Sequence, residues 1–72
     1  MMENKQEICN LLLKALQATR GGEDITALDY VNDKEVGVET VTMHYKNGYA
    51  KTMDVSCDSG TALIKDIMKG VS

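Results

Sequence analysis

Two segments with alternating apolar residues flank the tripeptide Lys-Asn-Gly at residues 46–48, and they restrict the fold more than any other feature of the chain. The segments, 38–45 and 49–55, are rich in Thr, Val and Tyr, whose branched or aromatic side chains suit a half-buried pleated surface. Asn-Gly is typical of the tight turn between two antiparallel strands. The sequence therefore predicts a β-hairpin in this part of the chain.

The length of the hairpin loop decides which side chains share a face of the sheet. A two-residue turn would pair Val41 with Asp54 and so mix apolar and charged side chains on one face. A three-residue loop with a left-handed glycine and a following bulge pairs Val41 with Met53 and Tyr45 with Tyr49. We predict the three-residue loop. It gives one apolar face (Val41, Met43, Tyr45, Tyr49, Met53 and Val55) and one polar face (Thr40, Thr42, His44, Ala50, Thr52 and Asp54).

A helix is predicted from Asn4 to about Arg20, because apolar residues recur there every three or four positions. Asn4 is placed to cap the first turn, and the two glycines at 21–22 are expected to end the helix in the left-handed conformation. Leu11 and Leu13 project to either side of the apolar centre line, which makes the face wider than a core contact requires. We expect one of them to serve a partner.

A second helix is predicted to begin at a cap formed by Asp58 or Ser59, to run to about Lys69 and to end at Gly70. Its inward stripe is expected to contain Leu63, Ile64, Ile67 and Val71.

A third strand is predicted around residues 25–31, where Leu28 and Tyr30 alternate but Ile25 and Val31 fall on the other parity. The order is then helix, three strands, helix. Elements in this order predict an α+β fold in which both helices cover one face of a three-stranded antiparallel sheet. At 72 residues, there is room for one core, so residues 1–72 are expected to form a single domain.

Composition excludes several classes of function. The net charge of −3 provides no field that would attract phosphate backbones, so nucleic acid is an unlikely partner. The longest aliphatic run, residues 11–13, is far shorter than the roughly 20 apolar residues of a membrane span. Cys9 and Cys57 are too far apart in sequence for a Cys-x-x-Cys pair, and the first residues do not resemble a secretory signal. We expect a cytoplasmic protein with two reduced, buried thiols.

The sequence gives weak support to catalytic or metal chemistry. His44 is the only histidine, and on the polar sheet face it lacks a clear partner for proton transfer, since Asp54 lies toward the far end of the hairpin. One histidine and two separated cysteines do not form a recognised metal-binding spacing. The small residues at 58–61 could leave free amides for an anion, but a helix cap is the simpler interpretation. We expect no catalytic residue, no metal and no cofactor.

The leading functional hypothesis is a non-catalytic protein-interaction module that binds another protein or a second copy of itself, because so small a core gains stability from a partner. One alternative is a nucleic-acid-binding module, and another is a small enzyme. The first candidates for contact are spare apolar and flat polar side chains: Leu11, Leu13, Thr40, Thr42, His44 and Thr52.

The order of elements resembles that of double-stranded-RNA-binding domains, which implies binding through basic residues at the start of the last helix. Here that position reads Asp-Ser-Gly-Thr (58–61), so the resemblance argues against this function. The segments Tyr-Lys-Asn-Gly-Tyr (45–49) and Asp-Ser-Gly-Thr-Ala (58–62) resemble small uncharacterised proteins of Gram-positive bacteria and their phages. That resemblance implies an accessory protein and supplies no functional residues.

Overall fold

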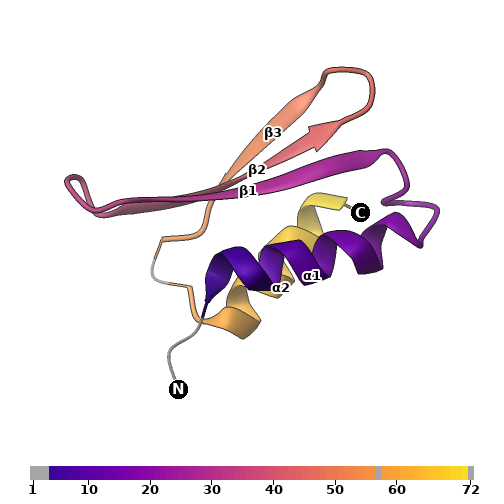
Figure 1. The fold of residues 1–72 in the computed structure, drawn as a ribbon. Helices are drawn as coiled ribbons and strands as arrows, with labels where there is room; N and C mark the ends of the chain where they lie inside the picture. The colour runs from indigo at the N-terminus through magenta and orange to yellow at the C-terminus, as the bar shows by residue number, and fades with distance from the viewer. Residues whose placement is uncertain (1–3, 57, 72) are drawn as a thin grey trace.

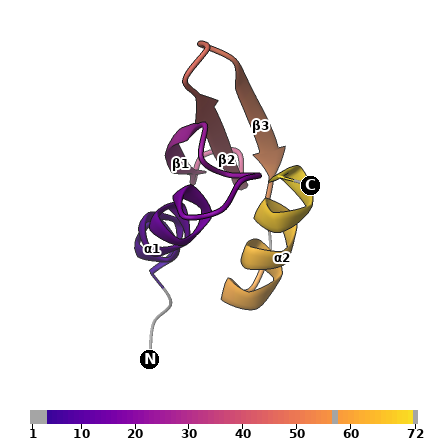
Figure 2. The ribbon, with the colours of Figure 1, turned by 90° about the vertical axis from the view of Figure 1, so that its right-hand side faces the viewer.

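The predicted α+β architecture is confirmed by a computed structural model, which describes residues 4–56 and 58–71. The elements are α1 (Lys5–Gln17), β1 (Ile25–Asp33), β2 (Val38–Tyr45), β3 (Ala50–Asp54) and α2 (Gly60–Val71). The strands form one antiparallel sheet in the order β1-β2-β3 (Figure 1). Both helices lie on the same side of this sheet, with α2 on the β3 side of α1 (Figure 2).

The β2–β3 hairpin has the predicted three-residue loop. Val41 pairs with Met53, and the amide of Tyr45 donates to the carbonyl of Tyr49 at 2.9 Å. Gly48 has a φ of 87°, a left-handed conformation that side-chain-bearing residues rarely adopt. The predicted faces follow from this register, with Val41 and Met43 fully buried. Tyr49 belongs only in part to the predicted apolar face. Its ring packs against that of Tyr45 with centroids 5.5 Å apart, but 58% of the residue remains exposed.

Strand β1 is longer than predicted, and an irregularity explains its mixed parity. The register against β2 shifts between Ile25 and Ala27, so the chain contains one additional residue there. This shift turns Ile25 to the core side together with Leu28, and both are buried. Val31 remains on the opposite face, where it is 55% exposed.

The core lies between the sheet and the two helices. Both helices, β1 and β2 contribute fully or almost fully buried side chains, and next to β3 the buried residue is Val55. Partly buried side chains, among them Leu13 and Met53, close its margins. The buried core residues are Cys9, Leu16, Ile25, Leu28, Val41, Met43, Val55, Leu63 and Ile67.

Helix α1 begins as predicted but ends differently. The Asn4 side chain accepts a hydrogen bond from the amide of Glu7 at 3.0 Å, as expected of an N-cap. The helix ends at Gln17, three residues before the predicted end, and Ala18 caps it in a right-handed conformation. The prediction of left-handed glycines at 21–22 is wrong, because the positive-φ glycines are Gly37 and Gly48.

Helix α2 starts at the predicted position, and Ser59 is its cap. The Ser59 hydroxyl accepts from the amide of Ala62 at 3.3 Å, and its carbonyl accepts from the amide of Leu63 at 2.9 Å. Leu63 and Ile67 point into the core as predicted. The inward placement of Ile64 is wrong, because the residue is 37% exposed. Gly70 does not end the helix either, since α2 continues to Val71.

Candidate functional site

The outer face of the sheet carries four of the residues nominated from sequence: Thr40, Thr42, His44 and Thr52. The hydroxyls of Thr42 and Thr52 are 3.1 Å apart across β2 and β3 and form a hydrogen bond. The three threonine side chains are short. Together with His44 they make this part of the outer face polar.

His44 has a partner that sequence reasoning missed. Its Nε2 lies 3.0 Å from a carboxylate oxygen of Asp29 on β1. The β1–β2 register places Asp29 opposite Thr42, which is two residues from His44 on the same face. The two side chains are 42% and 63% exposed respectively, so solvent surrounds the pair. This arrangement is typical of a polar contact on the protein surface.

A polar cluster lies on the inner side of the sheet, beside the N-terminal turn of α1. The Lys5 ammonium is 2.7 Å from a Glu39 carboxylate oxygen, and the same oxygen accepts a hydrogen bond from the Tyr30 hydroxyl. Partial burial, this hydrogen bond and the carboxylate charge together raise the pKa of Tyr30 to about 12. The phenol therefore remains protonated at neutral pH and donates to the carboxylate.

Two carboxyl groups lie together near the start of α2. A hydrogen bond between Asp58 and Asp66 raises the pKa of Asp58, and burial and the nearby negative charge add to the effect. One carboxyl oxygen of Asp58, Oδ2, is buried and has no hydrogen-bond partner among residues 4–56 and 58–71. Because ionisation of both groups is unfavourable, the folded protein binds a proton here more tightly than the unfolded chain does.

The substitution Asp58→Asn tests this carboxyl pair. A raised pKa in the folded state adds stability that is fully present below the ordinary pKa of 3.8 and is lost as the pH rises through the folded-state value. The amide can still donate to Asp66 but carries no charge. We therefore expect a higher melting temperature than the parent at neutral pH and no gain below pH 3.8. Thermal unfolding followed by circular dichroism measures the melting temperature at each pH. An equal gain at the two pH values would show that the carboxyl pair does not link stability to pH.

The side of α1 that faces away from the sheet presents the clearest apolar surface. Leu11 is 61% exposed there. It borders a shallow depression of about 310 Å³ between the two helices, whose lining is almost entirely apolar. The lining residues are Ile8, Leu11, Leu12, Ala15 and Ile64. An exposed apolar surface bordered by polar side chains is typical of a protein-binding site.

Of the two leucines nominated for a partner, Leu11 lies on this exposed surface and Leu13 does not. Leu13 is partly buried and packs against the core. Two charged side chains, Glu7 and Lys14, flank Leu11 along the helix and are exposed. We define the α1 stripe as the exposed or half-buried residues Glu7, Ile8, Leu11, Lys14 and Ala15.

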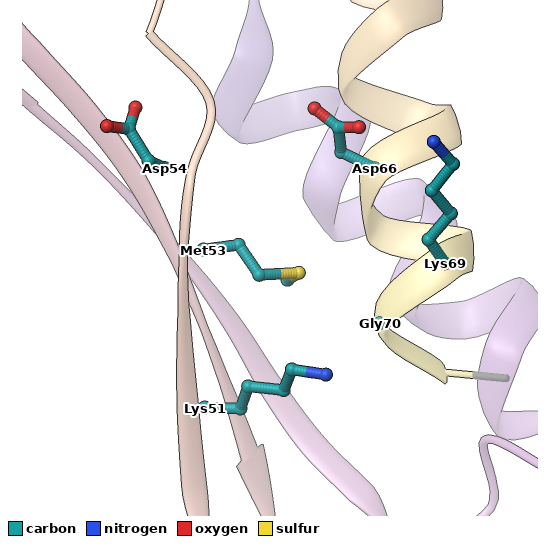
Figure 3. Close-up of a pocket in the computed structure, with 6 residues that line it drawn as sticks. All are labelled: Lys51, Met53, Asp54, Asp66, Lys69 and Gly70. Atoms are coloured by element: carbon teal, nitrogen blue, oxygen red, sulfur yellow. The ribbon is translucent and has the colours of Figure 1, made fainter.

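A second hollow lies between β3 and α2 (Figure 3). It is an open groove of about 300 Å³. The Met53 side chain extends across it toward α2 (Figure 3). A Cβ at Gly70 would lie 2.8 Å from the Met53 sulfur, so the absence of a side chain there lets Met53 approach the helix. The lining residues are Lys51, Met53, Asp54, Asp66, Lys69 and Gly70.

Within 4–56 and 58–71, the His, Cys, Asp and Glu side chains form no group of three that could hold a metal ion. Cys9 is a free thiol inside the core, and burial raises its pKa, which disfavours the reactive thiolate. The predicted burial of Cys57 lies outside the described residues.

Neither α1 nor α2 combines the length and the apolar character that a bilayer-crossing helix requires. No protein-family model, curated protein or solved structure matches the chain.

Proposed function

We propose that this chain is a non-catalytic protein-interaction module that associates with a second copy of itself through the α1 stripe. The exposed Leu11 above an apolar depression between the helices carries the proposal. Burying a leucine of this kind is worth about 1.5–3 kcal/mol, and a symmetric interface would bury it twice. The core formed by the described part of the chain has nine buried residues and is small, so a partner adds a useful share of stability.

Charge along the α1 stripe favours a second copy as the occupant. Glu7 precedes Leu11 by one turn, and Lys14 follows it by almost one turn. If two copies of α1 pack antiparallel with their Leu11 side chains at the two-fold axis, each Glu7 lies near the other copy's Lys14. Antiparallel packing also places the N-terminal end of one helix dipole beside the C-terminal end of the other. The stripe is therefore complementary to itself.

The substitution Leu11→Gln tests the apolar part of this interface. We expect the parent chain to shift from one-chain to two-chain mass between low and high micromolar concentration, and Leu11→Gln to dimerise about tenfold or more weakly. Sedimentation velocity measures both. Val36→Gln is the matched control, because Val36 is 68% exposed in the turn between β1 and β2. A parent that stays monomeric, or a control that loses as much affinity, would overturn the proposal.

Charge reversal tests the orientation of the two helices. Glu7→Lys alone and Lys14→Glu alone each place like charges together in the antiparallel arrangement, and we expect both to weaken the dimer. The double variant restores opposite charges at both contacts and should recover most of the affinity. If the double variant is as weak as the sum of the single ones, the antiparallel arrangement about Leu11 is wrong.

The structure gives less support to the two alternative functions. The outward residues of the sheet include Asp29, Asp33 and Asp54 but no lysine or arginine, a poor surface for a phosphate backbone. An enzyme would need a site that excludes water, whereas the His44–Asp29 pair is largely exposed. The accessory role implied by the resemblance to phage-associated proteins stays a prediction.

A further inference from the structure

The two edges of the sheet differ in how their main-chain groups are used. On β1, the amide of Tyr30 donates to the side-chain oxygen of Gln6 at 3.1 Å, and the same side chain's Nε2 is 3.5 Å from the carbonyl of Leu28. Gln17 donates to the carbonyl of Ile25 at 2.9 Å. Side chains from α1 therefore occupy three main-chain groups on this edge that a further strand would need.

Within residues 4–56 and 58–71, no side chain covers the edge formed by β3 in this way. The residues that flank β3 bond to β2: the amide of Tyr45 donates to the carbonyl of Tyr49, and the amide of Val55 donates to the carbonyl of Glu39, both at 2.9 Å. Because pairing groups alternate along an antiparallel strand, the main-chain groups of even-numbered β3 residues point away from β2. These residues are Ala50, Thr52 and Asp54, and all three are exposed.

The groove between β3 and α2 lies along this open edge, on the inner side of the sheet (Figure 3). An added strand would direct alternate side chains into it, since successive side chains point to opposite faces. Met53 and Gly70 provide an apolar floor for one such side chain. Charge changes along the groove: Lys51 lies at one end, and Asp66 lies on α2 toward the other end with Lys69 beside it, while the Asp54 carboxylate points away from Asp66 (Figure 3).

We propose that β3 accepts an extended segment of a partner protein as a fourth, antiparallel strand. The side chain opposite Met53 is aliphatic and fills the groove. The side chain opposite Lys51 is acidic, and the one that faces Asp66 on α2 is basic, because opposite charges placed side by side are favourable. Read from its N-terminus, the segment has the pattern basic-x-aliphatic-x-acidic. Main-chain hydrogen bonds supply affinity and the inward side chains supply specificity.

A second copy fits this site less well than such a segment. The chain's own β3 region reads Lys51-Thr52-Met53-Asp54-Val55, which supplies the basic and apolar positions but has valine in the acidic one. The site is separate from the α1 stripe, which lies on the far side of the helices from the sheet. The two proposals can therefore fail independently.

A labelled peptide with the core Lys-Thr-Ile-Thr-Glu, flanked by threonines, tests the site by fluorescence anisotropy against the full chain. We expect saturable binding that is at least about tenfold tighter than binding of the reversed core Glu-Thr-Ile-Thr-Lys. In amide spectra of the complex, the Thr52 signal should shift and the Tyr30 signal should not. No binding at high micromolar concentration, or equal binding of the two peptides, would overturn the proposal.

Variants of β3 separate main-chain from side-chain recognition. Thr52→Pro removes an outward amide that β2 does not use, and proline is tolerated on sheet edges, so we expect a folded chain that loses the peptide at least about tenfold. Thr52→Val keeps that amide and should bind as the parent does. If Thr52→Pro misfolds, Lys51→Glu decides: it should lose the first peptide and bind one with the core Lys-Thr-Ile-Thr-Lys.

Two outcomes would name a different occupant or a different surface. A dimer that dissociates in Thr52→Pro would identify a second copy at the β3 edge and overturn the peptide proposal. Loss of the peptide in Leu11→Gln would place binding on the α1 stripe, with the same consequence. Peptide binding that survives in a monomeric Leu11→Gln chain would support this site whatever the oligomeric state of the parent.

Discussion

Replacing Leu63 with alanine is expected to remove about 2–5 kcal/mol from the free energy of unfolding, because the substitution leaves a cavity in the core. Leu63 is fully buried on α2 among the residues that join the helix to the sheet. A chain of 72 residues has a total stability of roughly 4–11 kcal/mol. The variant should therefore lose a large share of the stability of the fold. Urea denaturation followed by far-UV circular dichroism measures the loss.

The neighbouring residue provides the control for this substitution. Ile64 is 37% exposed, so Ile64→Ala should change the free energy of unfolding by less than about 1 kcal/mol. Both variants are measured at a concentration at which the parent is monomeric, since Ile64 borders the proposed interface. Equal losses in the two variants would show that α2 is rotated relative to the arrangement described here.

The second large effect is expected at Gly22, where the chain passes close to the end of α1. A Cβ on this residue would lie 2.3 Å from the carbonyl oxygen of Leu16, closer than such atoms can approach. Because the obstacle is backbone, the turn itself must shift. We expect Gly22→Ala to cost about 1–3 kcal/mol, the range for additional atoms in a packed site. Denaturation midpoints in urea provide the measurement.

Gly21 is the matched control for that experiment. A Cβ there would lie 3.6 Å from a methyl carbon of Val71, which is an ordinary contact. Gly21→Ala should leave the free energy of unfolding within about 0.5 kcal/mol of the parent. If both alanine variants lose stability equally, the close approach to Leu16 is not the reason that glycine is needed at position 22.

The hairpin could be predicted from the sequence because its determinants are local. The Asn-Gly loop and the alternating residues of the two flanking segments together allow only one register with a uniformly apolar face. Strand β1 was predicted less well. Its register against β2 shifts between Ile25 and Ala27, and nothing in the residues themselves indicates where an extra residue will be accommodated.

The end of α1 illustrates a different reason for failure. Two consecutive glycines are typical of a left-handed helix end, but here the Thr19 hydroxyl donates to the carbonyl of Leu16 at 2.6 Å and accepts from the amide of Gly22 at 3.0 Å. These bonds stabilise a right-handed turn, and the glycine is required for space instead. A side-chain bond of this kind depends on the path of the following chain, which the local sequence does not determine.

The candidate sites could be predicted from the sequence only in part. Leu11 could be nominated because helical spacing alone places it beyond the core stripe, whereas Leu13, on the other side of that stripe, meets the core. The His44–Asp29 pair required the register of β1, which the sequence left open. The groove beside β3 required the position of α2, a tertiary property.

The glutamine contacts on β1 also limit how far copies of this sheet could polymerise. Endless growth of a ribbon, as in an amyloid fibril, requires that each subunit both donate and receive a strand. Gln6 and Gln17 occupy main-chain groups of β1, so a copy that pairs through β3 presents a poor template to the next copy. We therefore expect assembly through β3 to stop at two copies.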